Sequence, residues 1–353
     1  MSEVIQPAPT RSPAPGRQPS GALVAELGRL AAETLKPLIR ADAPCALIDF
    51  PTHTNLGDSA IWLGQLALLR RLGLPRPSYA CDYMSYSRAR LAARIGDGTI
   101  LISGGGNFGD LYPHHQRLRE AVIADFPHNP IVQLPQSIHF TRPAGLEQVA
   151  RLCDAHRDFT LLVRDHASHE AARRTFRSPV VLCPDMAFGL GALPRRGAPD
   201  HDIVFIARRD REMREVGPAP AALPGMLRTD WLRERETLVH RIRSGLRRQA
   251  SKYPHADWLD RLASRSDGPL ARHRLLRGVT MLSRGRVVIT DRLHAHILSL
   301  LLGVPHCLLD NSYGKVRGCW ETWTHGAEPT VWCNSEAEAL VRVRELLASE
   351  GSE

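Results

Sequence analysis

Apolar positions along this chain alternate between helical spacing and short buried runs. They fall at helical spacing over 23–40, and the apolar run at 45–50 then predicts a buried strand that Pro51 ends. The same alternation predicts helices at 58–72, 86–95, 114–124, 146–156 and 167–176, and strands at 78–81, 99–102, 131–134, 160–163 and 180–182. Strands that alternate with helices predict an α/β fold with a mostly parallel sheet covered on both faces.

A stretch rich in Gly, Pro and charge near 190–201 has the composition of an interdomain linker. The alternation then resumes, with strands predicted at 202–207, 287–290 and 304–310, and helices at 275–283, from 291 to a stop at Gly303, and at 336–347. We therefore predict one domain at 21–192, a second at 200–330, and a C-terminal helix and tail at 331–353.

Residues 1–20 contain five prolines, and their composition predicts a disordered tail because it cannot bury enough apolar surface. The chain has 46 basic and 37 acidic residues, a net charge of +9. This balance permits nucleic acid, an anionic membrane or an anionic small molecule as a partner. The excess is mostly Arg and is interleaved with acids at 233–248, which is more typical of a solvated helix face than of a nucleic-acid surface.

The remaining composition excludes several classes of protein. The longest apolar run, 297–304, is far shorter than the roughly 20 residues of a membrane span, and the N-terminus has no apolar signal segment. The seven cysteines are scattered and odd in number, which predicts reduced, mostly structural thiols. The histidines at 53, 114 and 115 lack metal-ligand spacing, so no metal is expected. We expect a cytoplasmic location.

Polar and glycine-rich loops follow several predicted strands, and ligands bind at the carboxyl ends of strands in open parallel sheets. Gly104, Gly105 and Gly106 lack Cβ atoms, so the backbone there can approach a ligand closely and its N–H groups can face an anion. The sequence around them is neither a dinucleotide-binding nor a Walker motif. A tight turn without a ligand explains these glycines equally well.

The sequence DRLH at 291–294 opens a predicted helix, whose first N–H groups favour an anion. Arg292 can donate paired hydrogen bonds to a carboxylate or phosphate, and His294 can act as an acid or base. Lys315 follows the next strand and is a further candidate anion ligand. The structural alternatives are an ion pair of Arg292 with Asp185 or Asp165, a structural role for His294, and a solvated Lys315.

Taken in order, the motifs of this chain resemble those of the polysaccharide pyruvyl transferase family. The motifs are NLGD at 55–58, GGGNFGD at 104–110, PQS at 135–137, VRD at 163–165, PD at 184–185, DRLH at 291–294 and YGK at 313–315. The resemblance covers most of the chain and implies two Rossmann-like domains facing a cleft, in a GT-B-like arrangement, with the acceptor on the first domain and the donor on the second.

The resemblance also implies the reaction. Phosphoenolpyruvate is the expected donor, with no other cofactor, and pyruvate is placed as a cyclic ketal across two hydroxyls of a saccharide while phosphate is released. On this reading His294 donates a proton to the methylene carbon of the donor, and Arg292, Lys315 and Arg164 bind its phosphate and carboxylate. The expected setting is the biosynthesis of an exopolysaccharide or cell-surface glycan.

The acceptor side is predicted from the loops of the first domain. Asp58 and Asp110 are candidates to orient or deprotonate a sugar hydroxyl, with helix capping and turn stabilisation as their respective alternatives. The candidate acceptor-binding residues are Asn55, Gly105, Gly106, Asn107 and Gln136, each with a turn role as the alternative.

The Arg-rich segment 210–267 matches no motif of the family. We expect it to shape the choice of acceptor or to contact anionic lipid at the inner face of the membrane, since acceptors in such pathways are often lipid-linked saccharides. The alternative functions are a GT-B glycosyltransferase that uses a nucleotide sugar, a noncatalytic binding protein of the same fold, and a nucleic-acid binder supported only by the net charge.

Overall fold

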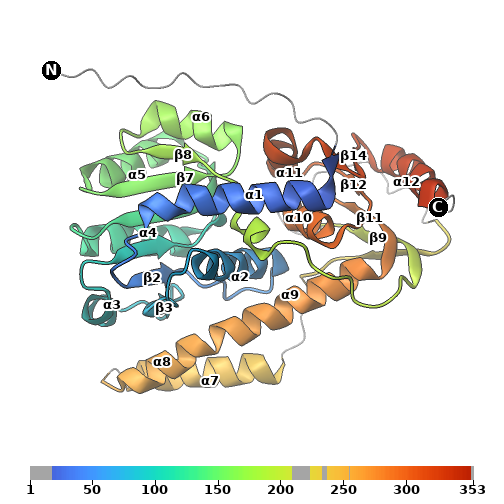
Figure 1. Ribbon diagram of the computed structural model, residues 1–353. Coiled ribbons are helices and arrows are strands. Elements are labelled where there is room, and N and C mark those ends of the chain that lie inside the picture. The colour runs from blue at the N-terminus through green and yellow to red at the C-terminus, as the bar shows by residue number, and fades with distance from the viewer. Residues whose placement is uncertain (1–17, 209–222, 233–236, 254, 351–353) are drawn as a thin grey trace.

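The computed structural model describes residues 18–208, 223–232, 237–253 and 255–350. Two large sheets and one two-stranded sheet, all with parallel pairing throughout, organise these residues (Figure 1). The prediction of an α/β fold with parallel strands is therefore confirmed. The GT-B-like arrangement and the two domain ranges stay predictions, and the segment between Leu190 and His201, where the boundary was predicted, contains no helix or strand.

The first sheet has the strand order β3-β2-β4-β6-β7-β8, and β5 pairs with β6 beside this path. Strands β2, β3, β4, β7 and β8 lie close to the ranges that the apolar pattern predicts, and β2, β4 and β7 are buried at every residue. The elements in chain order are β2 (Cys45–Ile48), α2 (Leu56–Arg71), β3 (Tyr79–Cys81), α3 (Arg88–Ile95), β4 (Thr99–Ile102), β5 (Gly105–Gly109), α4 (Pro113–Asp125), β6 (Ile131–His139), α5 (Pro143–Ala155), β7 (Phe159–Val163), α6 (His166–Thr175) and β8 (Val180–Leu182).

The second sheet has the order β10-β9-β11-β12-β14. The short helix η2 (Met186–Leu190) precedes it in the chain. The elements that follow η2 in chain order are β9 (His201–Ile206), β10 (Met226–Thr229), α7 (Leu238–Lys252), α8 (Asp257–Arg265), α9 (Asp267–Ser283), β11 (Gly285–Thr290), α10 (Leu293–Leu302), β12 (His306–Leu308), α11 (Lys315–Cys319), the π-helix η3 (Trp320–Thr324), β13 (Ala327–Glu328), β14 (Thr330–Trp332) and α12 (Glu336–Glu350). As predicted, Gly303 ends α10, in the left-handed conformation that glycine adopts readily.

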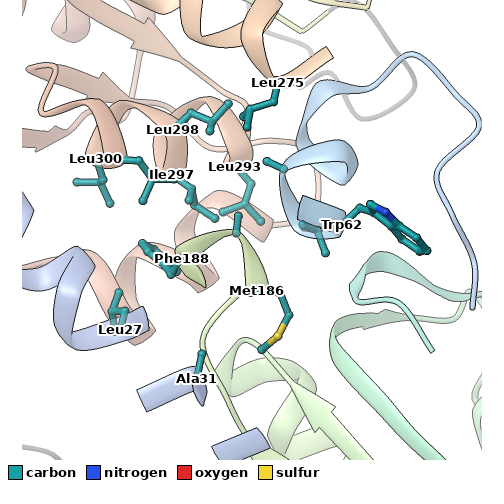
Figure 2. Packing of buried hydrophobic residues seen from close by; sticks show 14 of the residues in the cluster. Leu27, Ala31, Trp62, Met186, Phe188, Leu275, Leu293, Ile297, Leu298 and Leu300 are labelled. Atoms are coloured by element: carbon teal, nitrogen blue, oxygen red, sulfur yellow. The ribbon is translucent and has the colours of Figure 1, made fainter. Parts of the chain in front are cut away.

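One apolar cluster joins the two halves of the chain. Helix α1 (Ser20–Leu35) and the short helix η1 (Lys36–Leu38) precede the first sheet, and α1 contacts α2, η2 and α10. Figure 2 shows Leu27 of α1 and Phe188 of η2 beside Leu293 and Ile297 of α10. The two sheets are therefore packed through shared helices, which brings the carboxyl ends of β11 and of the strands of the first sheet together.

Residues 18–20, the end of the predicted tail, are structured. Gln18 and Pro19 form β1 and pair with β13, and α1 begins at Ser20. Backbone pairing with a strand from the far end of the chain orders these residues, which composition alone does not reveal. The rest of the predicted tail, residues 1–17, lies outside the described residues. All seven cysteines are free and buried, in agreement with the prediction of reduced structural thiols.

Two predicted loops are strands. Strand β6 continues through Pro135 to His139, and β5 pairs with its second half. The register of β6 against β7 shifts between Gln133 and Gln136. This irregularity accommodates Pro135, which has no N–H for a regular ladder. The motifs at 104–110 and 135–137 therefore lie side by side.

The described part of the Arg-rich segment contains helices α7 and α8, which form an arm with the following helix α9. The solvated helix face predicted at 233–248 is present in part, because Arg241 and Arg248 are exposed. Arg243 of α7 is buried and lies 2.6 Å from both Asp82 and Asp267. Arg94 of α3 pairs with Asp260 of α8 at 3.0 Å. Arginines thus pair with aspartates of elements that are distant in sequence, and these pairs hold the arm against the edge of the first sheet. Residues 209–222 of the Arg-rich segment lie outside the described residues.

Candidate active site

His294, in the first turn of α10, lies against the first turn of α2. A Cβ atom on Gly57 would lie 2.1 Å from Nδ1 of His294 and 2.6 Å from its Cβ. Gly57 is the second residue of α2, so only a residue without a side chain allows the two helix starts to meet this closely. The motifs at 55–58 and 291–294, which are far apart in sequence, therefore form one site.

An aspartate after β8 links His294 to an arginine after β7. Oδ2 of Asp185 lies 2.6 Å from Nη1 of Arg164 and 3.4 Å from Nε2 of His294. All three side chains are at most 9% exposed. Burial acts to raise the pKa of Asp185, but His294, Arg164 and the N–H of Ala187 outweigh it and hold that pKa well below its usual range. Asp185 is therefore an anion that lies against the imidazole of His294 and the guanidinium of Arg164.

Arg164 is held from two sides. Its Nε donates a hydrogen bond to Oγ of Ser137 at 3.0 Å, and that hydroxyl donates to Asp165 at 2.6 Å. Burial acts to lower the pKa of Arg164, but Asp185 and Asp165 raise it overall. The guanidinium is thus permanently charged and fixed in direction.

Lys315, at the start of α11, reaches the glycine loop of the first sheet. Its Nζ lies 3.5 Å from the carbonyl oxygen of Gly106 and 3.3 Å from Oη of Tyr313. A Cβ atom on Gly106 would lie 2.8 Å from this Nζ and 3.2 Å from Nη2 of Arg164. Two cations from different sheets therefore meet over a backbone that carries no side chain. This arrangement suits a small anion with several charges.

Asp58 borders the same glycines. Its Oδ1 would lie 3.3 Å from a Cβ atom on Gly105, and its Oδ2 accepts a hydrogen bond from Nδ2 of Asn55 at 2.8 Å. Oδ1 of Asn55 accepts from the N–H of Gly57, so Asn55 caps α2. The capping role that was the structural alternative for Asp58 thus falls to Asn55. Nε2 of His53 lies 3.5 Å from Asp58.

Arg292 has a partner that the sequence did not suggest. Its side chain is 2% exposed and lies 2.7 Å from Oδ1 of Asp230, the residue after β10. Its guanidinium lies 5.9 Å from the centre of the Trp231 ring. The partners considered from sequence, Asp185 and Asp165, instead contact Arg164 and Ser137. Asp230 thus orients Arg292, which is two residues from His294.

Three predicted acceptor residues occupy structural positions. Asp110 accepts hydrogen bonds from the N–H and hydroxyl of Thr141, which is the turn role that was its alternative. Gln136 is fully buried and donates to Oδ1 of Asn107 at 2.8 Å. Asn107 also accepts from Arg119 at 2.9 Å. All three side chains thus have hydrogen-bond partners within the protein, as their structural alternatives required, and their roles toward an acceptor stay predictions.

Sequence reasoning missed a buried histidine–aspartate pair beside Asp58. Nδ1 of His115 lies 2.7 Å from Oδ1 of Asp49, and the rings of His115 and His53 are 6.2 Å apart. Burial acts to lower the pKa of His115, but its hydrogen bond to Asp49 and the charge of that carboxylate raise it overall. Asp49, which has a φ of 76°, directly follows β2, so its position at a strand end was a usable signal. Nothing in the sequence pairs it with His115.

The described residues contain neither a candidate metal site nor a membrane-spanning helix. No group of three or more His, Cys, Asp or Glu side chains in this part of the chain is arranged to hold a metal ion. None of the helices in the described ranges is both long and apolar enough to cross a membrane.

Comparisons with known proteins agree with the motifs. The family model for polysaccharide pyruvyl transferases matches residues 55–313. The chain is 36% identical over 294 residues to Pyruvyl transferase 1 of Schizosaccharomyces pombe, covering 80% of this chain and 70% of that protein. It is 29% identical over 293 residues to EpsO of Bacillus subtilis, whose name assigns it provisionally to the pyruvyl transferases, covering 80% of this chain and 86% of EpsO.

Among solved structures, a functionally uncharacterised protein from Klebsiella pneumoniae has a similar fold. The TM-score is 0.56 at 16% identity, covering 86% of this chain and 97% of that one.

Proposed function

The chain belongs to the polysaccharide pyruvyl transferase family and is an enzyme of that type, and we propose that it transfers the pyruvyl group of phosphoenolpyruvate to two hydroxyls of a saccharide. The product is a cyclic ketal, and inorganic phosphate leaves. We place the donor beside Lys315, Arg164 and His294, and the acceptor beside Asp58. The expected setting is the synthesis of an exopolysaccharide or another cell-surface glycan.

The charges at the site suit this donor. Phosphoenolpyruvate carries a phosphate and a carboxylate, so its binding requires several cations in a partly dry site. Lys315 and Arg164 supply two, and a protonated His294 supplies a third. Because Gly106 has no Cβ, both cations can approach its backbone closely, where a donor anion can bind them together. Arg292, oriented by Asp230 at 2.7 Å, lies two residues from His294, and its contact with an anionic group of the donor stays a prediction.

His294 is the proton donor in this proposal. It protonates the methylene carbon of the donor, which leaves an electron-deficient C2 that the first sugar hydroxyl attacks. Asp185, 3.4 Å from Nε2, keeps the ring in place. General acid help of this kind contributes about 10² to 10⁴ in rate.

Asp58 accepts the proton of the attacking hydroxyl. The C2–O bond to phosphate then breaks, C2 becomes electrophilic again, and the second hydroxyl closes the ring as its own proton is released. Each new C–O bond costs one hydroxyl proton, and the methylene carbon gains one to become a methyl group. Asn55, 2.8 Å from Asp58, keeps that carboxylate directed at Gly105.

The convergence of Lys315 and Arg164 on Gly106, with His294 against Gly57, is the observation that supports this function. Calorimetric titration with phosphoenolpyruvate tests it. The wild type and His294→Ala are expected to bind the donor, while only the wild type releases phosphate when a saccharide acceptor is added. Binding of UDP-sugars but not of phosphoenolpyruvate would instead indicate the glycosyltransferase alternative, which the family match does not favour.

The acceptor can be found in the source organism. Mass spectrometry of the surface polysaccharide with and without this protein is expected to differ by a pyruvyl ketal on one sugar. The same polysaccharide, freed of ketals by mild acid, is then the acceptor for assays. An unchanged polysaccharide in the deletion strain would contradict the proposed role in glycan synthesis.

A further inference from the structure

Helices α7 and α8 expose large apolar side chains that nothing in the described chain covers. Ten large apolar side chains are exposed in the described part of the protein, and half of them lie on these two helices or the turn between them. They are Leu238 at 65%, Ile242 at 50%, Tyr253 at 58%, Trp258 at 65% and Leu262 at 42%. An exposed cluster of this kind marks a surface that binds something apolar.

Basic side chains share the exposed face. On α8, Trp258, Arg261, Leu262 and Arg265 recur at intervals of three or four residues, so they project on one side of the helix. All four are exposed. Helix α7 also exposes both apolar and basic side chains: Leu238 and Ile242, together with Arg241, Arg248 and Lys252.

The acidic residues of the arm lie mostly on its inner side. Asp260 is 1% exposed and pairs with Arg90 and Arg94 of α3. Asp267 is likewise 1% exposed and pairs with Arg243 and Arg247. These two carboxylates are paired inside the protein, whereas Asp257 is 49% exposed and pairs with Arg261 and Arg94. Apolar and basic side chains therefore outnumber this one carboxylate on the exposed surface of α7 and α8.

The inner side also attaches the arm firmly to the first half of the chain. Arg90 donates to the carbonyl oxygen of Ala250 at 3.0 Å, and Ser264 donates to that of Ala80 at 2.9 Å. Figure 1 shows α7 and α8 at the lower edge of the molecule, near α3 and β3. The apolar face is therefore held outward by contacts on the opposite side of the same helices.

We propose that the outer face of α7 and α8 binds peripherally to an anionic lipid surface. Trp and Tyr side chains favour the boundary between headgroups and acyl chains, and Arg and Lys bind anionic headgroups. Each basic side chain near such a surface adds to the attraction. A second copy of this chain is a poorer occupant, because pairing two such faces brings like charges together.

The arm connects this face to the loop that precedes α2. Arg274 of α9 donates to the carbonyl oxygens of Pro51 and Thr52 and lies 2.8 Å from Nε2 of His240 on α7. That loop leads to His53 and Asn55. Arg274 and His240 therefore link the arm to the loop that carries His53 and Asn55 beside Asp58.

Sedimentation of the full-length protein with vesicles tests the proposal. Vesicles of phosphatidylcholine alone are compared with vesicles of two parts phosphatidylcholine to one part phosphatidylglycerol. We expect binding to the anionic vesicles only, and its loss at about 1 M salt, where screening acts within about 3 Å. The double variant Trp258→Ser, Leu262→Ser is expected to bind roughly tenfold or more weakly, and so is Arg261→Gln, Arg265→Gln.

The matched control is Met84→Ser, which removes an apolar side chain that is 67% exposed and lies outside the arm. It is expected to bind like the wild type. Brominated phosphatidylcholine in the anionic vesicles is expected to quench tryptophan fluorescence in the wild type, and less so in Trp258→Phe, which still binds.

Failure of the wild type to sediment with anionic vesicles would overturn the proposal, and so would unchanged binding by the Trp258 and Leu262 double variant. Dimerisation through this face without vesicle binding, seen by analytical ultracentrifugation, would assign it to a second copy instead. None of these measurements involves phosphoenolpyruvate, so their outcome is independent of the proposed reaction.

Discussion

Gly57→Ala tests whether the contact between α2 and α10 sets the position of His294. The new Cβ would lie 2.1 Å from Nδ1 of His294, and ordinary Cβ contacts begin at 3.4 Å, so the ring has to retreat by about 1.3 Å. Alanine is a better helix former than glycine by up to about 1 kcal/mol, so the effect does not arise from the helix itself. Misplacement of a reacting group by about 1 Å can cost about 10²-fold in rate.

We therefore expect kcat to fall about 10²-fold, with binding of phosphoenolpyruvate retained. Phosphate release measures kcat with ketal-free polysaccharide as acceptor, and calorimetry measures donor binding. Gly21→Ala is the matched control, because a Cβ there meets nothing within 4 Å, and it is expected to behave like the wild type. If Gly57→Ala turned over within about threefold of the wild type while His294→Ala was inactive, the positioning argument would be refuted, since the ring would act from a displaced position.

Three further outcomes follow from the site and its surroundings. Lys315→Met should weaken phosphoenolpyruvate binding in calorimetry by roughly 10- to 100-fold, because a charge-assisted contact is lost, while Lys36→Met should not. Burial raises the pKa of Asp291 from 3.8 to about 6, so the native state binds more protons than the unfolded state between these pH values and loses stability as the pH rises through them. Asp291→Asn should therefore raise the Tm by roughly 4 °C near pH 8 and change it little near pH 4 in thermal melts; an equal shift at both would contradict this sign. Asp49→Asn should lower the pKa of His115 below its usual value in an NMR titration, because burial then acts without the opposing carboxylate.

Most helices and strands were predictable because the spacing of apolar residues along the chain indicates which face of each element is buried. Strand β4 lies at the range predicted from its apolar run, and α10 ends at the predicted Gly303. The errors occur where backbone pairing, not side-chain pattern, decides the structure. Strand β5 consists largely of glycine, and β6 contains Pro135, so neither has the apolar run expected of a strand.

The site was predictable in part for a similar reason. Parallel strands bring their carboxyl ends to one edge, so Arg164, His294 and Lys315 were sound candidates once their strands were placed. Their roles as direct ligands stay predictions. Asp110 and Gln136 stood at strand ends as well, but hydrogen bonds to Thr141 and Asn107 occupy them.

The sequence by itself determined the alternation of helices and strands, the order of the motifs and the family to which they belong, because these depend on spacing along the chain. Only the tertiary structure decided which charges meet. Arg292 pairs with Asp230, Arg164 pairs with Asp185, and Arg243 of the arm pairs with Asp82 and Asp267. Which charged side chains pair depends on how elements far apart in sequence are packed, because the packing sets the distance from each side chain to its possible partners.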